Sequence, residues 1–411
     1  MVLRVYFEKY GCSLNQAETV NIVENYLSMG YELTDDPEKA DRIVIGTCVV
    51  IQHTENQMVR RVRELSEYGR PVIVYGCLPM VREERLRGIE NVYPVKIHQD
   101  NFLDGKITWK NPIFVGETTY TIPIAQGCTG SCSYCISKFS RGYIKSMDIS
   151  WIIERIKLAR DKGYREIRLT ALDSAAYGTD INRDLSDLLN AINNLEGDFR
   201  IRVGMMEPSN MLGIMDRLLK SFRSEKVFKF FHVPFQSGND RILELMNRKY
   251  TARDSEFIIN KIRENFDYHT LSTDIITGFP GEDDDAFEDT VKLIEKIEPD
   301  ILNITRFSPR PGTQASKMKM VKSIASKERS LYLTDLHRNL SLKRNSMIKD
   351  MELDVIVTEK GKRGFLGRTE FYRPVVLENA VIGKWYKVYI EDVSPYYLKG
   401  RIISEKVKLY N

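Results

Sequence analysis

Three cysteines, Cys128, Cys132 and Cys135, are separated by three residues and then by two, a pattern that favours one shared metal centre. Thiolates this close repel one another and cannot all pair as disulfides, whereas a soft metal centre stabilises all three together. Three ligands leave one coordination position open, as in an iron–sulfur cluster that holds a reactant at one iron. Structural zinc is the alternative, but such sites are closed by a fourth ligand, and the neighbouring sequence has no fourth Cys and no His.

The remaining three cysteines, Cys12, Cys48 and Cys77, each follow a predicted strand. The predicted elements alternate as in a parallel α/β sheet, with strands at 3–10, 42–45 and 71–75 and helices at 16–29 and 53–68. Loops that leave the carboxyl ends of neighbouring parallel strands converge, so we expect these cysteines to meet in space. Their convergence favours a second iron–sulfur cluster over the alternative, which is three small buried residues that end strands.

Six strands, each followed by a segment of helical periodicity, are predicted in the central region, and they indicate a parallel β/α barrel. These strands are 120–125, 166–171, 200–206, 229–234, 270–277 and 301–307. Because barrel active sites lie at the carboxyl ends of the strands, polar and glycine residues just beyond each strand are candidate binding residues. The candidates are Asp173, Glu207, Gln236, Ser237, Gly278 and Gly281. For any one of them, turn formation or helix capping is the alternative role.

The last quarter of the chain changes rhythm and is basic. Residues 317–349 have helical periodicity, and the segments after them alternate apolar and polar residues between glycines, which predicts a small antiparallel barrel. Residues 317–411 carry 20 Lys and Arg against 11 Asp and Glu. This excess favours a nucleic-acid partner, although a solvated basic face is the alternative.

Length and composition limit the class of protein. A chain of 411 residues exceeds what one hydrophobic core usually supports, so two or three domains are expected. The sequence has no apolar run long enough to span a membrane, and it begins with a predicted strand, so we expect a cytoplasmic protein with no membrane partner.

Several segments resemble known families. The order Cys-x-x-x-Cys-x-x-Cys after a strand resembles radical S-adenosylmethionine enzymes. Lys9 to Glu18, Thr47-Cys48 and Gly76-Cys77 add a resemblance to the methylthiotransferases of that superfamily, as do Val233 to Gly238, Gly278 to Glu282 and Arg310 to Thr313. The family more often has Asn at position 46, Gln at position 172 and Asn at position 207, where this chain has Gly, Leu and Glu. The stretch from Gly367 to Val376 resembles the TRAM domain, an RNA-binding barrel.

The resemblance implies an α/β protein of three domains. Residues 1–110 would form a parallel α/β methylthiotransferase domain with the second cluster, 111–348 a partial (β/α)6 radical-SAM barrel with a helical connector, and 349–411 a TRAM-type antiparallel β-barrel. It implies two 4Fe-4S clusters and S-adenosylmethionine as cofactors. Cys128, Cys132 and Cys135 would hold the catalytic cluster, which passes an electron to S-adenosylmethionine to form a deoxyadenosyl radical. Cys12, Cys48 and Cys77 would hold the cluster that supplies sulfur, and Gly278 and Gly281 would let backbone amides approach the cofactor.

The resemblance also implies a tRNA substrate, contacted at the anticodon stem-loop, together with a low-potential electron donor such as a ferredoxin or flavodoxin and a sulfur donor. The expected RNA contacts are Arg368, Tyr372, Arg373 and Lys384. The segments Phe7 to Cys12 and Ala175 to Gly178 most resemble the archaeal and eukaryotic branch that acts on threonylcarbamoyladenosine. Isopentenyladenosine in tRNA or an aspartate of a ribosomal protein is the alternative substrate. A non-catalytic RNA-binding protein stabilised by zinc is the alternative of another class.

Overall fold

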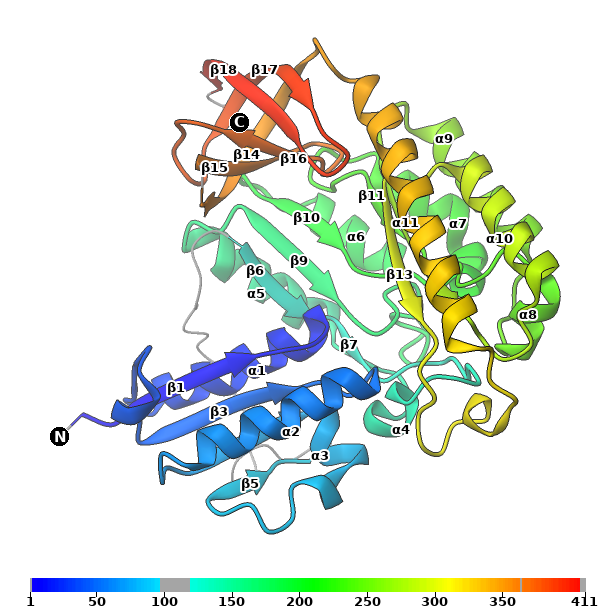
Figure 1. Cartoon of the computed structure of the whole chain (residues 1–411). Helices are drawn as coiled ribbons and strands as arrows, with labels where there is room; N and C mark the ends of the chain where they lie inside the picture. The colour runs from blue at the N-terminus through cyan, green and yellow to red at the C-terminus, as the bar shows by residue number, and fades with distance from the viewer. Residues whose placement is uncertain (1, 97–118, 363, 407–411) are drawn as a thin grey trace. The chain divides into compact units, whose positions relative to one another are not determined.

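The computed structural model describes residues 2–96, 119–362 and 364–406, which form two compact units (Figure 1). The first unit contains the described residues up to 96 together with 126–145 and 308–317. The second contains 119–125, 146–307 and 318–406. The predicted domain boundary at residue 110 lies outside the described residues. No helix in the described ranges is both long and apolar enough to cross a membrane.

The first unit is built on a five-stranded parallel sheet with the order β2-β1-β3-β4-β5. Its elements are β1 (Arg4–Lys9), α1 (Ser13–Ser28), β2 (Glu32–Leu33), β3 (Arg42–Thr47), α2 (Gln52–Ser66), β4 (Val72–Gly76), α3 (Cys77–Val81) and β5 (Val92–Pro94), with α4 (Ser137–Arg141) from the later segment. The three predicted strands are present as β1, β3 and β4. The sequence did not predict β2 and β5, which are short strands at the two edges.

Alternating side chains of the central strands bury the two faces of this sheet. On one face Val44, Ile73 and Tyr75 pack with residues of α1. On the other, Ile43, Ile45, Val72 and Val74 pack with Met58, Val59, Val62 and Leu65 of α2. Both faces of an all-parallel sheet are normally covered in this way, and the near-continuous apolar runs of β3 and β4 follow from it.

The second unit contains the predicted barrel, whose six parallel strands form two three-stranded sheets with the orders β6-β9-β10 and β11-β12-β13. Backbone hydrogen bonds from Phe228 to Ile201 and from Met206 to His232 join β10 to β11. The elements are β6 (Thr119–Pro123), α5 (Ile149–Asp161), β9 (Glu166–Thr170), α6 (Leu185–Asn193), β10 (Arg200–Val203), α7 (Pro208–Phe222), β11 (Phe230–His232), α8 (Asp240–Leu245), α9 (Ala252–Asn265), β12 (Thr270–Thr277), α10 (Asp284–Ile297) and β13 (Ile301–Arg306). Two-residue strands β7 (Ala125–Gln126) and β8 (Lys145–Ser146) pair separately.

The predicted connector and small barrel complete the second unit. Helix α11 (Ser323–Ser346) leads into a closed five-stranded barrel with the order β14-β15-β16-β18-β17. Its strands are β14 (Glu352–Gly361), β15 (Gly364–Thr369), β16 (Pro374–Leu377), β17 (Trp385–Val393) and β18 (Leu398–Lys406). The fold class predicted from the sequence is confirmed.

The small barrel docks on the amino-terminal ends of the large barrel's strands. The carbonyl groups of its loop between β15 and β16 accept two hydrogen bonds there: the Lys229 N–H donates to Glu370 over 3.0 Å, and the Thr270 hydroxyl donates to Phe371 over 2.5 Å. The ring of Tyr372 packs 4.9 Å from Phe228, between centroids. Aromatic packing and backbone hydrogen bonds together fix the small barrel to this end.

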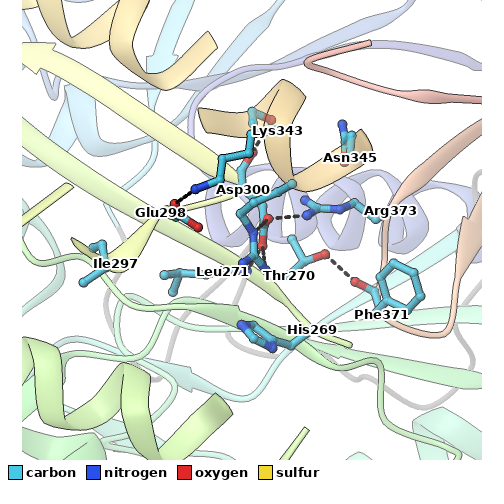
Figure 2. A network of polar contacts seen from close by, with 12 residues as sticks. His269, Thr270, Leu271, Ile297, Glu298, Asp300, Lys343, Asn345, Phe371 and Arg373 are labelled. Carbon is cyan, nitrogen blue, oxygen red and sulfur yellow. Dashed lines mark hydrogen bonds and ion pairs between the residues drawn. The ribbon is translucent and has the colours of Figure 1, made fainter. Parts of the chain in front are cut away.

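A buried carboxylate, Asp300, joins three elements at this junction (Figure 2). It is 3% exposed and accepts hydrogen bonds from the guanidinium groups of Arg344 in α11 and Arg373 in the small barrel, and from the Leu271 backbone over 2.7 Å. Burial alone would raise the pKa of Asp300, but the charges of Arg373 and Arg344 hold it below its ordinary value. Asp300 therefore remains ionised.

Replacing Asp300 with Asn should destabilise the second unit by about 3–5 kcal/mol, because the buried guanidinium of Arg373 and the largely buried one of Arg344 would lose their anion. Glu298→Gln is the matched control: Glu298 pairs with the exposed Lys343 close by, and an exposed pair contributes only about 0.5 kcal/mol. Urea unfolding of both variants measures the difference. An Asp300→Asn variant within about 1 kcal/mol of the control would show that the network does not hold the junction.

Candidate functional site

The structure brings Cys12, Cys48 and Cys77 to the carboxyl edge of three adjacent strands, β1, β3 and β4. Cys12 precedes α1 and Cys77 begins α3. A Cβ atom added to Gly11 would lie 2.9 Å from Cβ and 3.3 Å from Sγ of Cys48. Glycine at position 11, where φ is +86°, therefore lets the Cys12 loop approach Cys48.

The three thiols of this set influence one another electrostatically. The pKa of Cys48 is raised to about 11, chiefly by burial and also by the charges of Cys77 and Cys12, whereas the backbone N–H groups of Val50 and Val49 favour its thiolate. Desolvation by the surrounding protein also raises the pKa of Cys12, although this residue is exposed at the surface, and the Asn15 backbone and the Arg141 guanidinium act in the opposite direction. Three thiolates are unfavourable here without a cationic partner, and an iron centre would be such a partner.

The set formed by Cys128, Cys132 and Cys135 lies on the loop between β7 and α4. A Cβ atom on Gly130 would lie 3.3 Å from Sγ of Cys128 and 3.8 Å from Sγ of Cys132, so two of the sulfurs lie against the same residue. The Gly130 backbone N–H donates to the Cys128 sulfur over 3.2 Å. Burial raises the pKa of Cys135, and the Cys132 charge adds to this shift.

The surroundings of both cysteine sets suit an iron–sulfur cluster better than a single metal ion. Over the described ranges, no three His, Cys, Asp or Glu side chains are arranged to hold a metal ion. A multi-iron cluster is a larger body whose sulfurs accept hydrogen bonds from the surrounding backbone. Such donors are present: Val49 and Val50 at Cys48, Gly130 at Cys128, and Ser137 and Lys138 at Cys135. The thiolate ligands, their backbone donors and the glycine-lined approaches fit a cluster at each set.

The segment 308–317 packs in the first unit beside the loop that carries Cys128, Cys132 and Cys135. The Ala315 N–H donates to the carbonyl of Ser133 over 2.9 Å. Arg310, which is 1% exposed, forms an ion pair with Glu55, a carboxylate that also accepts from Arg82 and Arg85. The Arg310-Pro311-Gly312-Thr313 motif is thus fixed in the body that carries the cysteines.

In the barrel, Asp173 and Glu207 lie together beyond β9 and β10. Asp173 accepts hydrogen bonds from the backbone of Glu207 over 2.9 Å, from the backbone of Ala175 over 3.0 Å and from the Asn210 amide over 2.7 Å. Burial raises the pKa of Asp173 to about 6, against these hydrogen bonds. Glu207 also caps the amino terminus of α7.

The other barrel candidates have roles within the fold. Gln236 adopts φ +66° and continues the pairing with β12, and the buried hydroxyl of Ser237 lies 3.3 Å from that of Thr290. The Gly278 N–H already donates to Glu282 over 2.8 Å, and a Cβ there would lie 2.4 Å from the Ser326 hydroxyl. A Cβ on Gly281 would lie 2.8 Å from Leu245. These glycines are needed for packing, and cofactor contact by the barrel set stays a prediction.

Two of the four expected RNA contacts, Tyr372 and Arg373, are buried and have partners within the protein. Tyr372 is 7% exposed and donates its hydroxyl to Glu166, and Arg373 is 5% exposed and pairs with Asp300 (Figure 2). Both side chains serve the junction between the barrels because this face of the small barrel is docked. Lys384 remains half-exposed beside Glu405, and Arg368 stacks over Tyr372 with a small part of its side chain exposed. Arg368 and Lys384 therefore stay available as proposed contacts.

Sequence reasoning missed a group of buried polar residues in the first unit: Asn15, Glu18 and Arg141. The guanidinium of Arg141 donates to Glu18 over 2.5 Å and to Asn15 over 2.9 Å. The available signal was in α1, where polar residues interrupt the buried side of the helix at positions 15, 18 and 19. Buried polar side chains on a helix need hydrogen-bond or ion-pair partners. The periodicity of α1 shows that such a partner is needed but does not identify it as Arg141.

Comparison with known families gives three matches along the chain. The family described as "Uncharacterized protein family UPF0004" matches residues 4–95, the "Radical SAM superfamily" matches 122–294, and the "TRAM domain" matches 351–403. These matches coincide with the parallel-sheet region, the large barrel and the small closed barrel.

Curated relatives match over nearly the whole chain. A protein of Archaeoglobus fulgidus named "Probable threonylcarbamoyladenosine tRNA methylthiotransferase" is 38% identical over 98% of this chain and 100% of its own length. A protein of Methanocaldococcus jannaschii with the same name is 36% identical over 98% of each chain. The "Threonylcarbamoyladenosine tRNA methylthiotransferase" of Danio rerio is 28% identical over 98% of this chain and 79% of its own.

Solved structures agree on the fold. The radical S-adenosylmethionine methyltransferase TsrM from Kitasatospora setae, solved with cobalamin and a [4Fe-4S] cluster, superposes with a TM-score of 0.57 at 13% identity and covers 77% of each chain. At this identity the likeness shows the fold alone. The family is shown by the full-length relatives and the matching family model: the chain belongs to the radical S-adenosylmethionine family of threonylcarbamoyladenosine tRNA methylthiotransferases.

Proposed function

We propose that this protein attaches a methylthio group to C2 of threonylcarbamoyladenosine next to the anticodon of tRNA. The single observation that carries the proposal is that one compact unit contains two separate sets of three cysteines. One set suits radical generation, and the other suits the supply of sulfur. The names of the archaeal and eukaryotic relatives support the choice of substrate.

Cys128, Cys132 and Cys135 would hold the radical-generating cluster on the β7–α4 loop. When bound, the cluster and S-adenosylmethionine supply one-electron chemistry that removes a hydrogen atom from the substrate carbon. The three thiolates leave one iron open for the methionine end of the cofactor. Asp173, Glu207, Gln236, Ser237, Gly278 and Gly281 are our proposed contacts to S-adenosylmethionine in the barrel, with Asp173 suited to a cationic group above pH 6, where its carboxylate is ionised.

Cys12, Cys48 and Cys77 would hold a second 4Fe-4S cluster at the edge of the parallel sheet. Their role is to present sulfur at an open iron, and a second S-adenosylmethionine would supply the methyl group. The backbone donors at Cys48 and the Arg141 charge beside Cys12 favour thiolate ligands at this set.

The tRNA would contact the protein at its anticodon stem-loop. Arg368 and Lys384 of the small barrel are our proposed contacts to its phosphates. A ferredoxin- or flavodoxin-type electron donor and a sulfur donor complete the proposed reaction partners. Because the substrate is tRNA, we propose the cytoplasm as the location.

Nucleoside analysis of tRNA from a strain that lacks this protein tests the substrate. We expect 2-methylthio-threonylcarbamoyladenosine to disappear and threonylcarbamoyladenosine to accumulate, with both reversed by a plasmid copy. Persistence of the methylthio derivative, in a strain with no paralogue, would show that the substrate is wrong. Loss of the methylthio group from isopentenyladenosine instead would assign the alternative tRNA substrate.

A further inference from the structure

Arg141 is a buried cation at the end of α4, the helix that follows Cys128, Cys132 and Cys135. Its side chain is 1% exposed, and it forms an ion pair with Glu18 of α1, whose side chain is 4% exposed. A second nitrogen donates to the Asn15 amide oxygen over 2.9 Å. A fully buried guanidinium is stable only when anions and acceptors surround it, so this location has a specific physical cause.

The partners of Arg141 extend to the loops that carry both cysteine sets. Glu18 also accepts from the Gln126 amide over 3.1 Å, two residues before Cys128. Asn15 also donates to the carbonyl of Tyr10 over 2.6 Å, two residues before Cys12. Arg141 and its two partners on α1, Glu18 and Asn15, thus hold the chain just before Cys128 and the chain just before Cys12 against the same helix.

Arg141 also lies near the cysteines at the edge of the parallel sheet, Cys12 and Cys77. Its chain neighbour Ser140 donates to Sγ of Cys77 over 3.4 Å. The Nε–H of Arg141 is buried and has no hydrogen-bond partner in the part of the chain that the structure describes. The guanidinium charge acts on the thiols of Cys12 and Cys77, and the guanidinium keeps one donor without a partner among the described residues.

We propose that Arg141 is a positioning residue that couples the two cysteine sets: it fixes α4 to α1 and presents a positive charge to the cluster ligated by Cys12, Cys48 and Cys77. The inference rests on the proposed function, because it needs a second cluster at these three cysteines. A buried cation next to an anionic cluster favours the reduced form, in which the cluster has gained one electron and is more negative. Arg141 thereby raises the reduction potential at the sulfur-supplying set.

The test uses full-length protein in which Cys128, Cys132 and Cys135 are all Ala, so that only the cluster at Cys12, Cys48 and Cys77 is present. Arg141→Gln is introduced into this parent, and iron content and an electron paramagnetic resonance titration with a chemical reductant are measured. We expect iron content to be retained. At the potential where the parent is half-reduced, the ratio of reduced to oxidised cluster should fall about tenfold, which is 59 mV for a one-electron couple.

Arg310→Gln is the matched control. Arg310 has the same 1% side-chain exposure, a buried Glu partner and a buried Nε–H without a partner among the described residues, but its hydrogen bonds go to Gln52 and Glu55. A general loss of packing would shift the potential in both variants alike. A shift in Arg141→Gln that is no larger than in Arg310→Gln would overturn the inference.

Two further outcomes separate the inference from the proposed function. A parent that binds no iron would refute the second cluster itself, and the inference with it. If only Arg141→Gln loses its iron, the same titration is made with Arg141→Lys. Lys keeps the positive charge but lacks the planar guanidinium that donates to two partners at once. In that variant the reduced-to-oxidised ratio should stay within about threefold of the parent, and a tenfold fall would contradict the charge role.

Discussion

Replacing Cys128, Cys132 and Cys135 together with Ala is expected to abolish reductive cleavage of S-adenosylmethionine. Side chains do not perform this one-electron chemistry, so losing the cluster ligands removes the reaction itself rather than slowing one step. Formation of 5′-deoxyadenosine should fall by more than about 1,000-fold, since enzymes exceed uncatalysed rates by roughly a million-fold or more. The measurement is chromatographic quantification of 5′-deoxyadenosine after incubation with S-adenosylmethionine and a strong reductant.

The matched control for this prediction replaces Ser131 and Ser133 in the same loop with Ala, which leaves every cysteine in place. This control should keep most of the activity, because neither hydroxyl is a proposed ligand. Substantial 5′-deoxyadenosine from the triple cysteine variant would contradict the assignment of the radical-generating set.

Replacing Cys12, Cys48 and Cys77 with Ala should separate the two halves of the reaction. Cleavage of S-adenosylmethionine should stay within about threefold of the native enzyme, because the ligands of the other cluster are intact. The methylthiolated nucleoside should fall below detection, because the proposed sulfur-supplying set is missing. Both products are measured in one reaction with tRNA that carries threonylcarbamoyladenosine.

Native-like thiolation by this second variant would refute the role of the first-unit cysteines. Loss of cleavage as well as thiolation would have a different meaning, because Arg141, Glu18 and Asn15 link the two loops within one unit. Circular dichroism and the iron content of the variant distinguish a collapsed unit from a lost catalytic role.

The sequence predicted the large elements because their signals are periodic and local. The central barrel is the clearest case: β12 (Thr270–Thr277) agrees with its predicted range, and β13 (Ile301–Arg306) is one residue shorter than predicted. Cysteines at the ends of β1, β3 and β4 could be predicted to meet, because parallel strands place their carboxyl ends on one edge. The short edge strands β2 and β5 were missed, since two or three residues carry no usable period.

The docked face of the small barrel could not be predicted from the sequence. Tyr372 and Arg373 have the residue types that bind RNA, and only the tertiary structure shows that Glu166 and Asp300 hold them at the junction. The same limit applies to Arg141, whose partner Glu18 is 123 residues away in the sequence. Buried ion pairs between distant segments leave no local pattern, so they follow from packing rather than from periodicity.

The most direct test of the two-cluster account is the metal content of protein purified without oxygen. We predict a brown native protein with about eight irons per chain, and about four in each triple cysteine variant. A colourless native protein with tightly bound zinc would contradict the account. So would about four irons in the native protein that remain unchanged when Cys12, Cys48 and Cys77 are replaced.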